Sequence, residues 1–385
     1  MLRGTFQLMK SVNKTSILNK IRLAEPISRA QISKETGITA PTVSAIVKEL
    51  IKEDLVEESV LGKSKGGRKP TLLLLKRDGH FVIGVDAGSN SIRVVATNLV
   101  GDVLYHRHQA VSKGISQNDY LVELSRVIKW VLDDLSERQD KVLGIGVAMH
   151  GVVRIASGEA LYASSTGFRH LPIKAFLEEL FPYPVIVENN SRAMTFGEYW
   201  FGNFDDAKTL IGISIGRGVG SGIIINGRLR HGAQDIAGEV GHMVVDYQGI
   251  KCSCGNYGCW ETLITGDAIV RQVIKMGWSE PDITPEKVYQ AALDRDPLAI
   301  KALASVGRMI GIGIVNLIHI INPDQILLGG GVMNSQEFLM PEIRKVISER
   351  ALTEKSRLEN HIVLSQLKEK ATVLGAAAIV LKDLF

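Results

Sequence analysis

Hydrophobic positions follow two different periods along the chain, and the change comes near residue 80. Before it, apolar residues recur every three or four positions, which predicts amphipathic helices. They are Ile17, Leu18, Ile21, Ile32, Val43, Ile46, Val47 and Leu50. After His80, short apolar runs end in glycine, asparagine or an acid, and they are FVIGVD, VLGIGV, YPVIVE, TLIGISIG, GIIIN and QILLGG. Strands that alternate with helices predict an α/β fold. The recurrence of strand-then-glycine motifs, GVDAGSNS and SIGRGVGSG, fits two lobes of related topology.

The segment from Ser28 to Lys52 has the pattern of a helix-turn-helix. One helix is predicted near Ser28 to Thr36, and Gly37 suits the positive φ of a tight turn. Thr39 can cap a second helix that has Pro41 in its first turn. Small polar residues then face outward and could reach base edges in the major groove. The expected DNA-binding residues of this helix are Thr39, Thr42, Ser44 and Lys48. The alternative is a helical hairpin that contacts a protein.

A basic, glycine-rich segment follows at residues 59–72, SVLGKSKGGRKPTL. It is predicted to form a wing between two strands. Its Arg68 and Lys69 could enter a minor groove, where the negative potential favours arginine. Residues 1–80 hold 15 Lys and Arg against 8 Asp and Glu, whereas residues 81–385 hold 30 against 33. A basic head on a slightly acidic body indicates a polyanion-binding module, with an incidental surface imbalance as the alternative.

The three cysteines of the chain, Cys252, Cys254 and Cys259, lie within eight residues. An odd, clustered set is not a disulfide framework, and it indicates a metal site. Three thiolates need one more ligand for tetrahedral Zn²⁺, and the nearest histidine is His242. A Cys₃His zinc site is therefore predicted, with three free structural thiols as the alternative.

These motifs resemble those of the ROK family, which comprises repressors, open reading frames and sugar kinases. GEVGH followed by CSCGNYGCWE is similar to the family's ExGH and CxCGxxGCxE motifs, and the resemblance covers essentially residues 80–385. The N-terminal segment with GGRKP resembles the repressor branch. The family implies a two-lobed, actin-like (ribonuclease H-like) sugar-kinase fold with a sugar between the lobes. The positions that match its sugar contacts are Asn189, Glu239, His242 and Glu261.

Several positions depart from the family's kinase pattern. The catalytic Asp of its END motif is Asn190 here, and a neutral amide cannot act as a general base. The first phosphate loop, DxGGTK in the family, reads Asp86 to Ser91 as DAGSNS, and Arg217 replaces the threonine of GTGxG. LLGGGV at 327–332 matches the adenosine-side motif, and packing is the favoured explanation for it. His150 and Ser165 replace typical residues near the sugar and could therefore reshape the pocket. The alternative for His150 is a packed or exposed loop histidine.

The combined expectation is a cytoplasmic, zinc-containing transcriptional repressor of a sugar operon, with a monosaccharide or amino sugar as inducer. The predicted domains are a winged helix-turn-helix at 1–78, a first ROK lobe at 79–198, and a second lobe with the zinc motif at 199–385. Operator DNA is the main expected partner, and a homodimer or homotetramer is expected because two heads would read a palindrome. The alternatives are a ROK sugar kinase with an accessory DNA-binding head, and a repressor that responds to a protein of the sugar-uptake machinery.

No membrane association is expected. The longest uncharged apolar run, Met309 to Ile321, has 13 residues, whereas a membrane-spanning helix needs about 20. The N-terminal segment MLRGTFQLMK has neither the long apolar stretch nor the cleavage site of a secretion signal.

Overall fold

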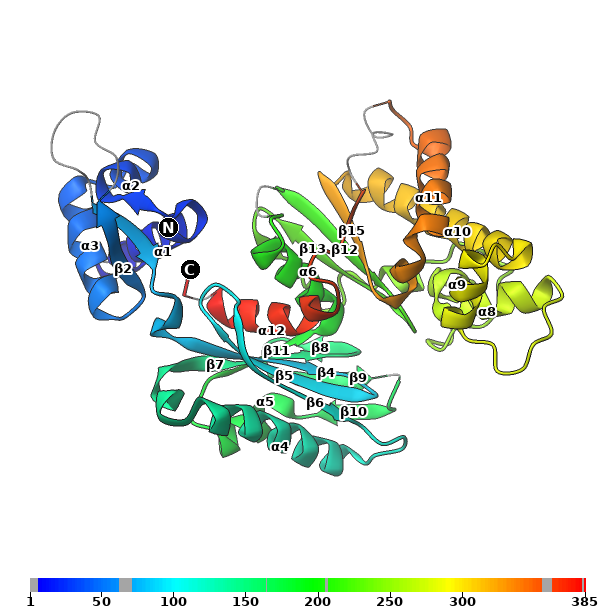
Figure 1. Cartoon of the computed structure of the whole chain (residues 1–385), viewed down its shortest axis with the longest axis horizontal. Coiled ribbons are helices and arrows are strands. Elements are labelled where there is room, and N and C mark those ends of the chain that lie inside the picture. The colour runs from blue at the N-terminus through cyan, green and yellow to red at the C-terminus, as the bar shows by residue number, and fades with distance from the viewer. Residues whose placement is uncertain (1–5, 62–70, 164, 205–206, 355–361, 383) are drawn as a thin grey trace.

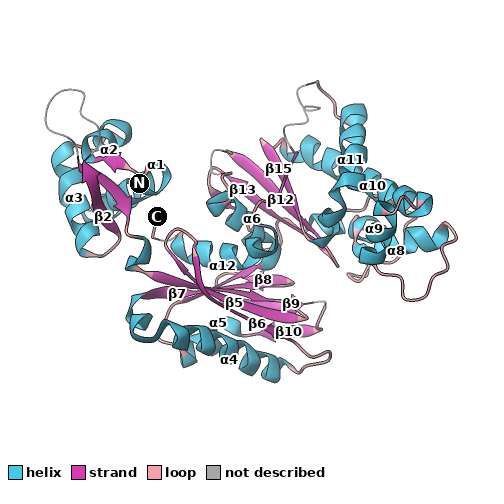
Figure 2. Cartoon of the chain, in the orientation of Figure 1, coloured by secondary structure: helices cyan, strands magenta, loops and turns pink. Residues whose placement is uncertain are grey.

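The N-terminal helical part of the sequence and the strand-rich part after His80 form distinct units that pack against each other (Figure 1). The computed structural model describes residues 6–61, 71–163, 165–204, 207–354, 362–382 and 384–385. A small head, residues 6–61 and 71–76, lies beside one end of a body that contains two lobes. Each lobe is built on a five-stranded sheet with helices on both faces (Figure 2). The expected α/β architecture is confirmed.

The head has the predicted helix-turn-helix. Ser28 caps the first helix of this motif because its side chain accepts the backbone N–H of Gln31, and Gly37 ends that helix with a φ of 72°. The apolar positions with the helical period are all buried. The strands on either side of the wing pair antiparallel, so the wing segment predicted at 59–72 begins and ends within strands. The elements of the head are α1 (Phe6–Ala24), β1 (Ile27–Ser28), α2 (Arg29–Thr36), α3 (Ala40–Lys52), β2 (Val56–Leu61) and β3 (Thr71–Leu75).

The first lobe contains the strand order β11-β7-β4-β5-β6. Helices α4 and α5 cover one face of this sheet, and α12 covers the other (Figure 1). Its elements are η1 (Arg77–Gly79), β4 (Phe81–Ala87), β5 (Ser91–Asn98), β6 (Val103–Ala110), α4 (Gln117–Leu135), η2 (Ser136–Lys141), β7 (Val142–Met149), β8 (Val152–Arg154), β9 (Glu159–Ala163), β10 (Phe168–Leu171), α5 (Ile173–Leu180) and β11 (Val185–Asn189).

The second lobe repeats this topology with the order β14-β13-β12-β15-β16. In each lobe three successive strands run antiparallel and two later strands join in parallel. The remaining elements are α6 (Asn190–Phe201), β12 (Thr209–Ile215), β13 (Val219–Ile225), β14 (Arg228–Leu229), η3 (Val240–His242), α7 (Glu261–Ile264), α8 (Gly266–Lys275), α9 (Pro285–Leu293), α10 (Pro297–Ile321), β15 (Gln325–Gly329), η4 (Gly331–Ser335), α11 (Gln336–Arg350), β16 (Ile362–Leu364), η7 (Lys368–Lys370) and α12 (Ala371–Leu381).

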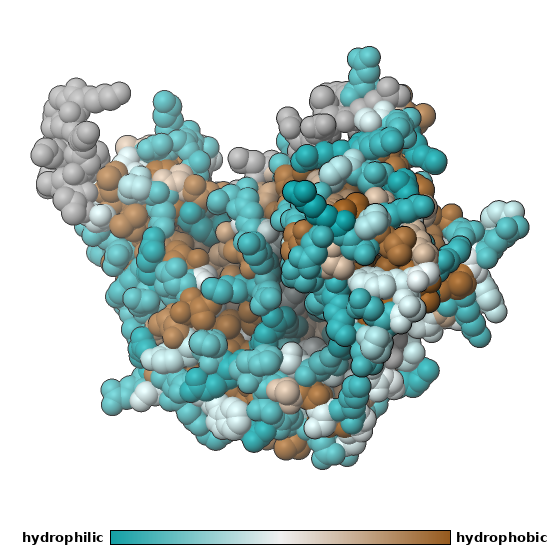
Figure 3. All heavy atoms as spheres, turned by 45° about the vertical axis from the view of Figure 1, so that its right-hand side comes forward, coloured by the Kyte–Doolittle hydropathy of each residue, from teal (hydrophilic) through white to brown (hydrophobic). Residues whose placement is uncertain are grey.

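Helix α12 returns from the C-terminal end of the chain to the first sheet, so the lobes are not continuous in sequence. The domain limits 1–78, 79–198 and 199–385 stay predictions, and the second limit falls within α6. The surface is indented between the head and the second lobe (Figure 3). Apolar groups on the face shown there are interspersed with polar ones.

One helix among the described residues, α10, is long and apolar enough to cross a membrane by length and composition alone. Over half of its most apolar window, 56%, is buried inside the protein. It packs against α11, and its buried side chains belong to the largest hydrophobic core of the second lobe. Its apolar character is thus accounted for by its place in the core.

Candidate functional site

The outward face of α3 carries the residues expected to contact DNA. Thr39, Ser44 and Lys48 are exposed, and Thr42 is half-buried. Thr39 stands at the N-cap position, but its hydroxyl lies 2.9 Å from the hydroxyl of Thr42 and accepts no backbone N–H of the helix. Arg68 and Lys69 lie outside the described residues. The four residues on or next to α3 are therefore accessible from solvent, and their contact with DNA stays a prediction.

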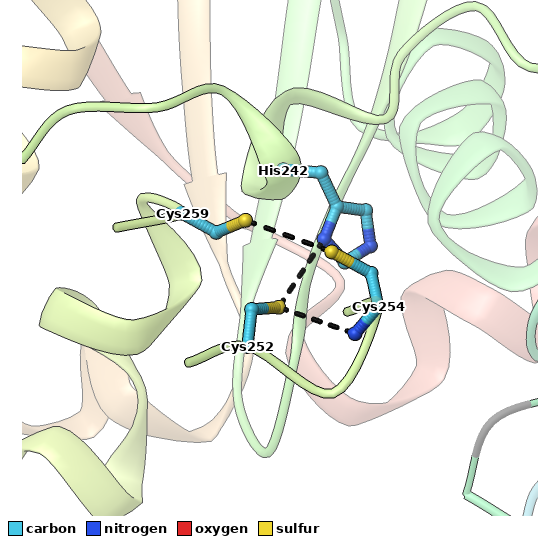
Figure 4. A group of neighbouring side chains, drawn as sticks. All are labelled: His242, Cys252, Cys254 and Cys259. Atoms are coloured by element: carbon cyan, nitrogen blue, oxygen red, sulfur yellow. Dashed lines mark hydrogen bonds between the residues drawn. The ribbon is translucent and has the colours of Figure 1, made fainter. Parts of the chain in front are cut away.

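The four expected metal ligands come together in the second lobe (Figure 4). All four donor atoms lie within 4.8 Å of one another. The Sγ atoms of Cys254 and Cys259 are 3.7 Å apart, and Cys252 Sγ is 3.7 Å from Nδ1 of His242. Ligands about 2.3 Å from a tetrahedral ion would be separated by about 3.7 Å. The cluster could therefore hold a metal ion.

Tight packing positions this cluster beside Glu261. Gly258 has a φ of 68°, and a Cβ at this position would lie 1.5 Å from the carbonyl oxygen of Asp246. Only glycine fits there. Trp260 is fully buried, and its indole N–H donates to the carbonyl of Met309 on α10 at 2.8 Å. The ring therefore fixes the start of α7, where Glu261 is the first residue.

The protonation state of Cys252 depends on whether a cation is bound in the cluster. Cys252 Sγ donates to Oε1 of Glu261 at 2.8 Å. Burial, together with the Glu261 carboxylate, raises the pKa of Cys252 to about 12. A neutral thiol is therefore preferred when no cation is bound, whereas a divalent ion would stabilise the thiolate.

His242 lies between the cysteines and a second acid. Its Nδ1 is on the cysteine side, while its Nε2 is 4.0 Å from Oε2 of Glu239. Burial raises the pKa of Glu239, against the opposing effects of His242 and Arg192. Glu239 and Glu261 thus lie on either side of the imidazole, which is the arrangement expected if one ring nitrogen binds metal and the other faces a ligand.

Asn189 lies at the junction of β11 and α6, where its side chain is largely used in capping. Its Oδ1 accepts the backbone N–H groups of Ser191 and Arg192, and its Nδ2 donates to the carbonyl of Gly151 at 2.8 Å. This leaves one amide hydrogen for a ligand. Asn190, the first residue of α6, is half-buried.

A buried ion-pair network, which was not predicted from the sequence, connects Asn189 with Glu239. Glu188 Oε1 accepts Nε–H of Arg192 at 2.6 Å, and Glu188 Oε2 lies 2.7 Å from Nε2 of His231. Arg192 is 1% exposed, and its Nη1 donates to the carbonyl of Asp235 at 2.9 Å. Nη2 of the same guanidinium has no hydrogen-bond partner within the described part of the chain. The network holds the loop that leads to Glu239 against the first turn of α6.

Glu188 and Arg192 are four residues apart, a spacing that predicts an ion pair only when both residues belong to one helix. Here Glu188 belongs to a strand and Arg192 to the following helix, so the sequence did not predict their contact. His231 is 43 residues further along the chain from Glu188. A pattern search along the sequence does not detect contacts of this kind.

The loops that depart from the kinase pattern have local partners of their own. Oδ2 of Asp86 accepts hydrogen bonds from Nη2 and Nε of Arg93, at 2.6 and 3.1 Å. His150 is buried, with Nδ1 3.1 Å from the carbonyl of Ala87 and Nε2 3.2 Å from the Thr166 hydroxyl. Of the two interpretations of His150, a packed histidine fits these contacts.

Gly330, in the adenosine-side motif, fits a packing role. A Cβ at Gly330 would lie 2.4 Å from the carbonyl oxygen of Ile215, so the close approach of two strands already requires glycine there. Arg217 and Ser165 are exposed.

Comparison with known proteins identifies the body. Residues 82–383 match the profile of the ROK family. The chain belongs to the ROK family. Residues 11–63, which include the helix-turn-helix, match the MarR family. The resemblance inferred from the cysteine and glycine motifs is thus confirmed.

Two relatives resemble this ROK protein over nearly its whole length, and a third resembles a part of it. The xylose repressor of Caldicellulosiruptor bescii is 34% identical and is aligned over 99% of this chain and 98% of its own. A crystal structure of a ROK family transcriptional regulator, homologous to the Escherichia coli MLC protein, has a TM-score of 0.85 with 30% identity, and covers 98% of this chain and 96% of its own. A Streptomyces griseus ROK glucokinase solved with glucose and AMPPNP has a TM-score of 0.67 with 29% identity, and covers only 78% of this chain but 98% of its own.

Proposed function

We propose that this protein is a cytoplasmic repressor of a carbohydrate-utilisation operon, and that it releases its operator when a sugar binds to the body. The observation that carries the proposal is the full-length likeness to a xylose repressor, head included. The glucokinase likeness covers less of the chain. A DNA-binding head joined to a sugar-kinase-like body would allow a small ligand bound to the body to change the affinity of the head for DNA.

The head would bind operator DNA through the outward end of α3. Thr39, Thr42 and Ser44 would reach base edges, and Lys48 would contact the phosphate backbone. The wing residues Arg68 and Lys69 would add contacts in a minor groove. Two heads of a homodimer or homotetramer would read the two halves of a palindrome.

The cluster of His242, Cys252, Cys254 and Cys259 would hold one structural Zn²⁺. The donor set and the separations of about 3.7 Å support this choice of metal. When bound, the metal would supply a fixed cationic centre that stabilises the thiolates. The residues of this chain would then be held in place around it: His242 would keep Nδ1 toward the cysteines and Nε2 toward the ligand.

The sugar would bind through its hydroxyl groups at Glu239, Glu261 and His242. A carboxylate accepts several hydrogen bonds, so two of them can fix several hydroxyls of a pyranose. The remaining amide hydrogen of Asn189 would donate to a further hydroxyl. A monosaccharide or an amino sugar fits this set of groups, and D-xylose is the first to test because of the relatives' name.

Phosphoryl transfer is not part of the proposed function. Asn190 has no basic oxygen with which to remove a proton from an attacking hydroxyl. Asp86, in the first phosphate loop, already binds Arg93 through two hydrogen bonds. These contacts support a ligand-binding body without kinase turnover.

The proposal is tested by titrating an operator fragment, selected from random DNA with the wild-type protein, in the presence and absence of sugars. We expect tight binding that weakens steeply with salt, and a fall in affinity with one sugar of the panel. A chain without residues 1–75 should bind no operator. Operator binding that survives this deletion would disprove the role of the head. Release only by a protein of the sugar-uptake machinery would disprove the sugar as inducer.

A further inference from the structure

Two helices, α6 and α12, each pack closely against the sheet of one lobe. Helix α6 packs against the second sheet so closely that a Cβ at Gly212 of β12 would lie 2.2 Å from Oγ1 of Thr195. Helix α12 packs against the first sheet in the same way, because a Cβ at Gly146 of β7 would lie 1.8 Å from the carbonyl oxygen of Ala376. Close packing of this kind makes each helix move with its own sheet.

The same two helices contact each other at glycines. A Cβ at Gly375 of α12 would lie 1.8 Å from the carbonyl oxygen of Ala193, and one at Gly197 of α6 would lie 2.4 Å from the carbonyl oxygen of Ala371. Any movement of one lobe relative to the other therefore requires α6 to slide or rotate on α12.

Both helices also end beneath the head. Trp200 is the penultimate residue of α6, and Phe385 follows α12 by four residues. Their rings are 5.8 Å apart and nearly perpendicular. In Figure 1 the end of the chain lies close to α1. The body thus presents one aromatic ring from each of these two helices to the first helix of the head.

A single side chain of the head contacts both rings. The guanidinium carbon of Arg22, in the last turn of α1, lies 4.0 Å from the ring centroid of Trp200 and 6.0 Å from that of Phe385. Attraction between a cation and an aromatic ring is effective only within about 6 Å. The term "junction cluster" is used below for Arg22, Trp200 and Phe385.

Apolar packing makes this contact part of a continuous core. Buried residues at the end of α12, Val380 and Leu381, belong to the same hydrophobic cluster as Ile17 and Ile21 of α1. The head is therefore not suspended on a flexible linker but packed on the ends of the two helices. A change in the relative position of α6 and α12 must therefore change the surface against which α1 packs.

We infer that the junction cluster couples the relative position of the two lobes to the orientation of the head. This inference rests on the proposed function, in which a sugar binds at the N-terminal end of α6. Helix shifts of about 1–2 Å are typical of such transitions. A shift of that size would move Trp200 relative to Phe385. The guanidinium of Arg22 is already 6.0 Å from the Phe385 ring centroid, at the limit of the attraction, so moving the two rings apart would break this contact.

The test compares full-length Arg22→Met with Arg77→Met. Each variant loses one positive charge in the same neighbourhood, but the side chain of Arg77 forms an exposed ion pair with Asp102, at 3.7 Å. Operator affinity is measured with and without saturating D-xylose, and xylose binding is measured separately by calorimetry. We expect wild type and Arg77→Met to lose at least tenfold in operator affinity with xylose. Arg22→Met should bind xylose normally but lose less than threefold.

Two more variants test whether misfolding, rather than lost coupling, explains a weaker response of Arg22→Met to xylose. Arg22→Lys retains a cation and should restore part of the response, and Trp200→Phe retains a smaller aromatic face and should give an intermediate one. If Arg22→Met and Trp200→Phe both release operator as wild type does, the coupling is disproved while the proposed function stands. If wild type binds xylose and every other sugar of the panel without releasing operator, the proposed function itself fails, and the coupling with it.

Discussion

Removing the guanidinium of Arg192 should be among the most destabilising single substitutions in the body. Arg192 is 1% exposed, and Glu188 beside it is 3% exposed. Burial would raise the pKa of Glu188, but hydrogen bonds and charge from His231 and Arg192 outweigh it and leave the pKa lowered. Arg192→Met leaves a buried carboxylate whose remaining partners are the imidazole of His231 and the backbone N–H of Asn189. It also removes the hydrogen bonds to the carbonyls of Asp235 and Ala237.

The expected loss follows from the cost of an uncompensated buried charge. Breaking a buried ion pair from one side typically costs about 3–5 kcal/mol, whereas removing both charges costs much less. We therefore expect Arg192→Met to lower the free energy of unfolding by about 3–5 kcal/mol. The double variant Arg192→Met with Glu188→Gln should recover about 2 kcal/mol of this loss.

The assay is urea unfolding at pH 7, followed by tryptophan fluorescence. A matched control is Lys129→Met, which breaks the exposed Lys129–Asp133 pair on α4 and should cost less than about 1 kcal/mol. The pKa of Glu188 in the folded protein lies below its unfolded value, so its stabilisation is present at neutral pH and is lost as the pH falls through the folded value. A loss below about 1 kcal/mol for Arg192→Met, or a double variant no more stable than the single one, would refute the reasoning.

Three further outcomes are expected. Cys254→Ser should contain less than one tenth of the zinc of wild type by elemental analysis and should lose the sugar response; wild type that is purified without zinc would contradict this. Burial lowers the pKa of His150, so the unfolded chain takes up a proton first as the pH falls below about 6.5 and stability declines. The decline in Tm from pH 7 to 5 should therefore be shallower in His150→Gln, and equal slopes would count against a buried neutral imidazole. Asn190→Asp should consume no ATP with any sugar of the panel, because Asp86 remains bound to Arg93; turnover like that of a working sugar kinase would overturn this.

Local patterns predicted the helix-turn-helix and the α/β class of the body, whereas the actin-like fold was implied by the resemblance to the ROK family. The apolar runs FVIGVD, VLGIGV and QILLGG are central strands, because a strand buried on both faces needs a continuous apolar stretch. Gly37 ends α2 in a left-handed conformation that its position between two helices required. The four metal ligands lie within 18 residues, so their spacing alone indicated the cluster.

Contacts between distant segments could not be predicted in this way. The Glu188–His231 and Arg22–Trp200 contacts join residues whose separations follow no period, and they depend on how the lobes and the head pack. Asn189 was predicted only as a sugar contact, and its use as the cap of α6 became visible only with the backbone. Buried polar networks depend on tertiary packing, which no short window of sequence contains.

The most direct test of the central claim is an operator titration of Glu239→Ala and Glu261→Ala with and without the sugar that releases the wild-type protein. These carboxylates lie in the body, away from α3, so operator affinity without sugar should stay near that of wild type. Each variant loses hydrogen bonds to the ligand that are typically worth about 1.5–3 kcal/mol when a charged group takes part. We predict that neither variant releases operator at the sugar concentration that suffices for wild type. Release of operator by both variants at that concentration would contradict the account.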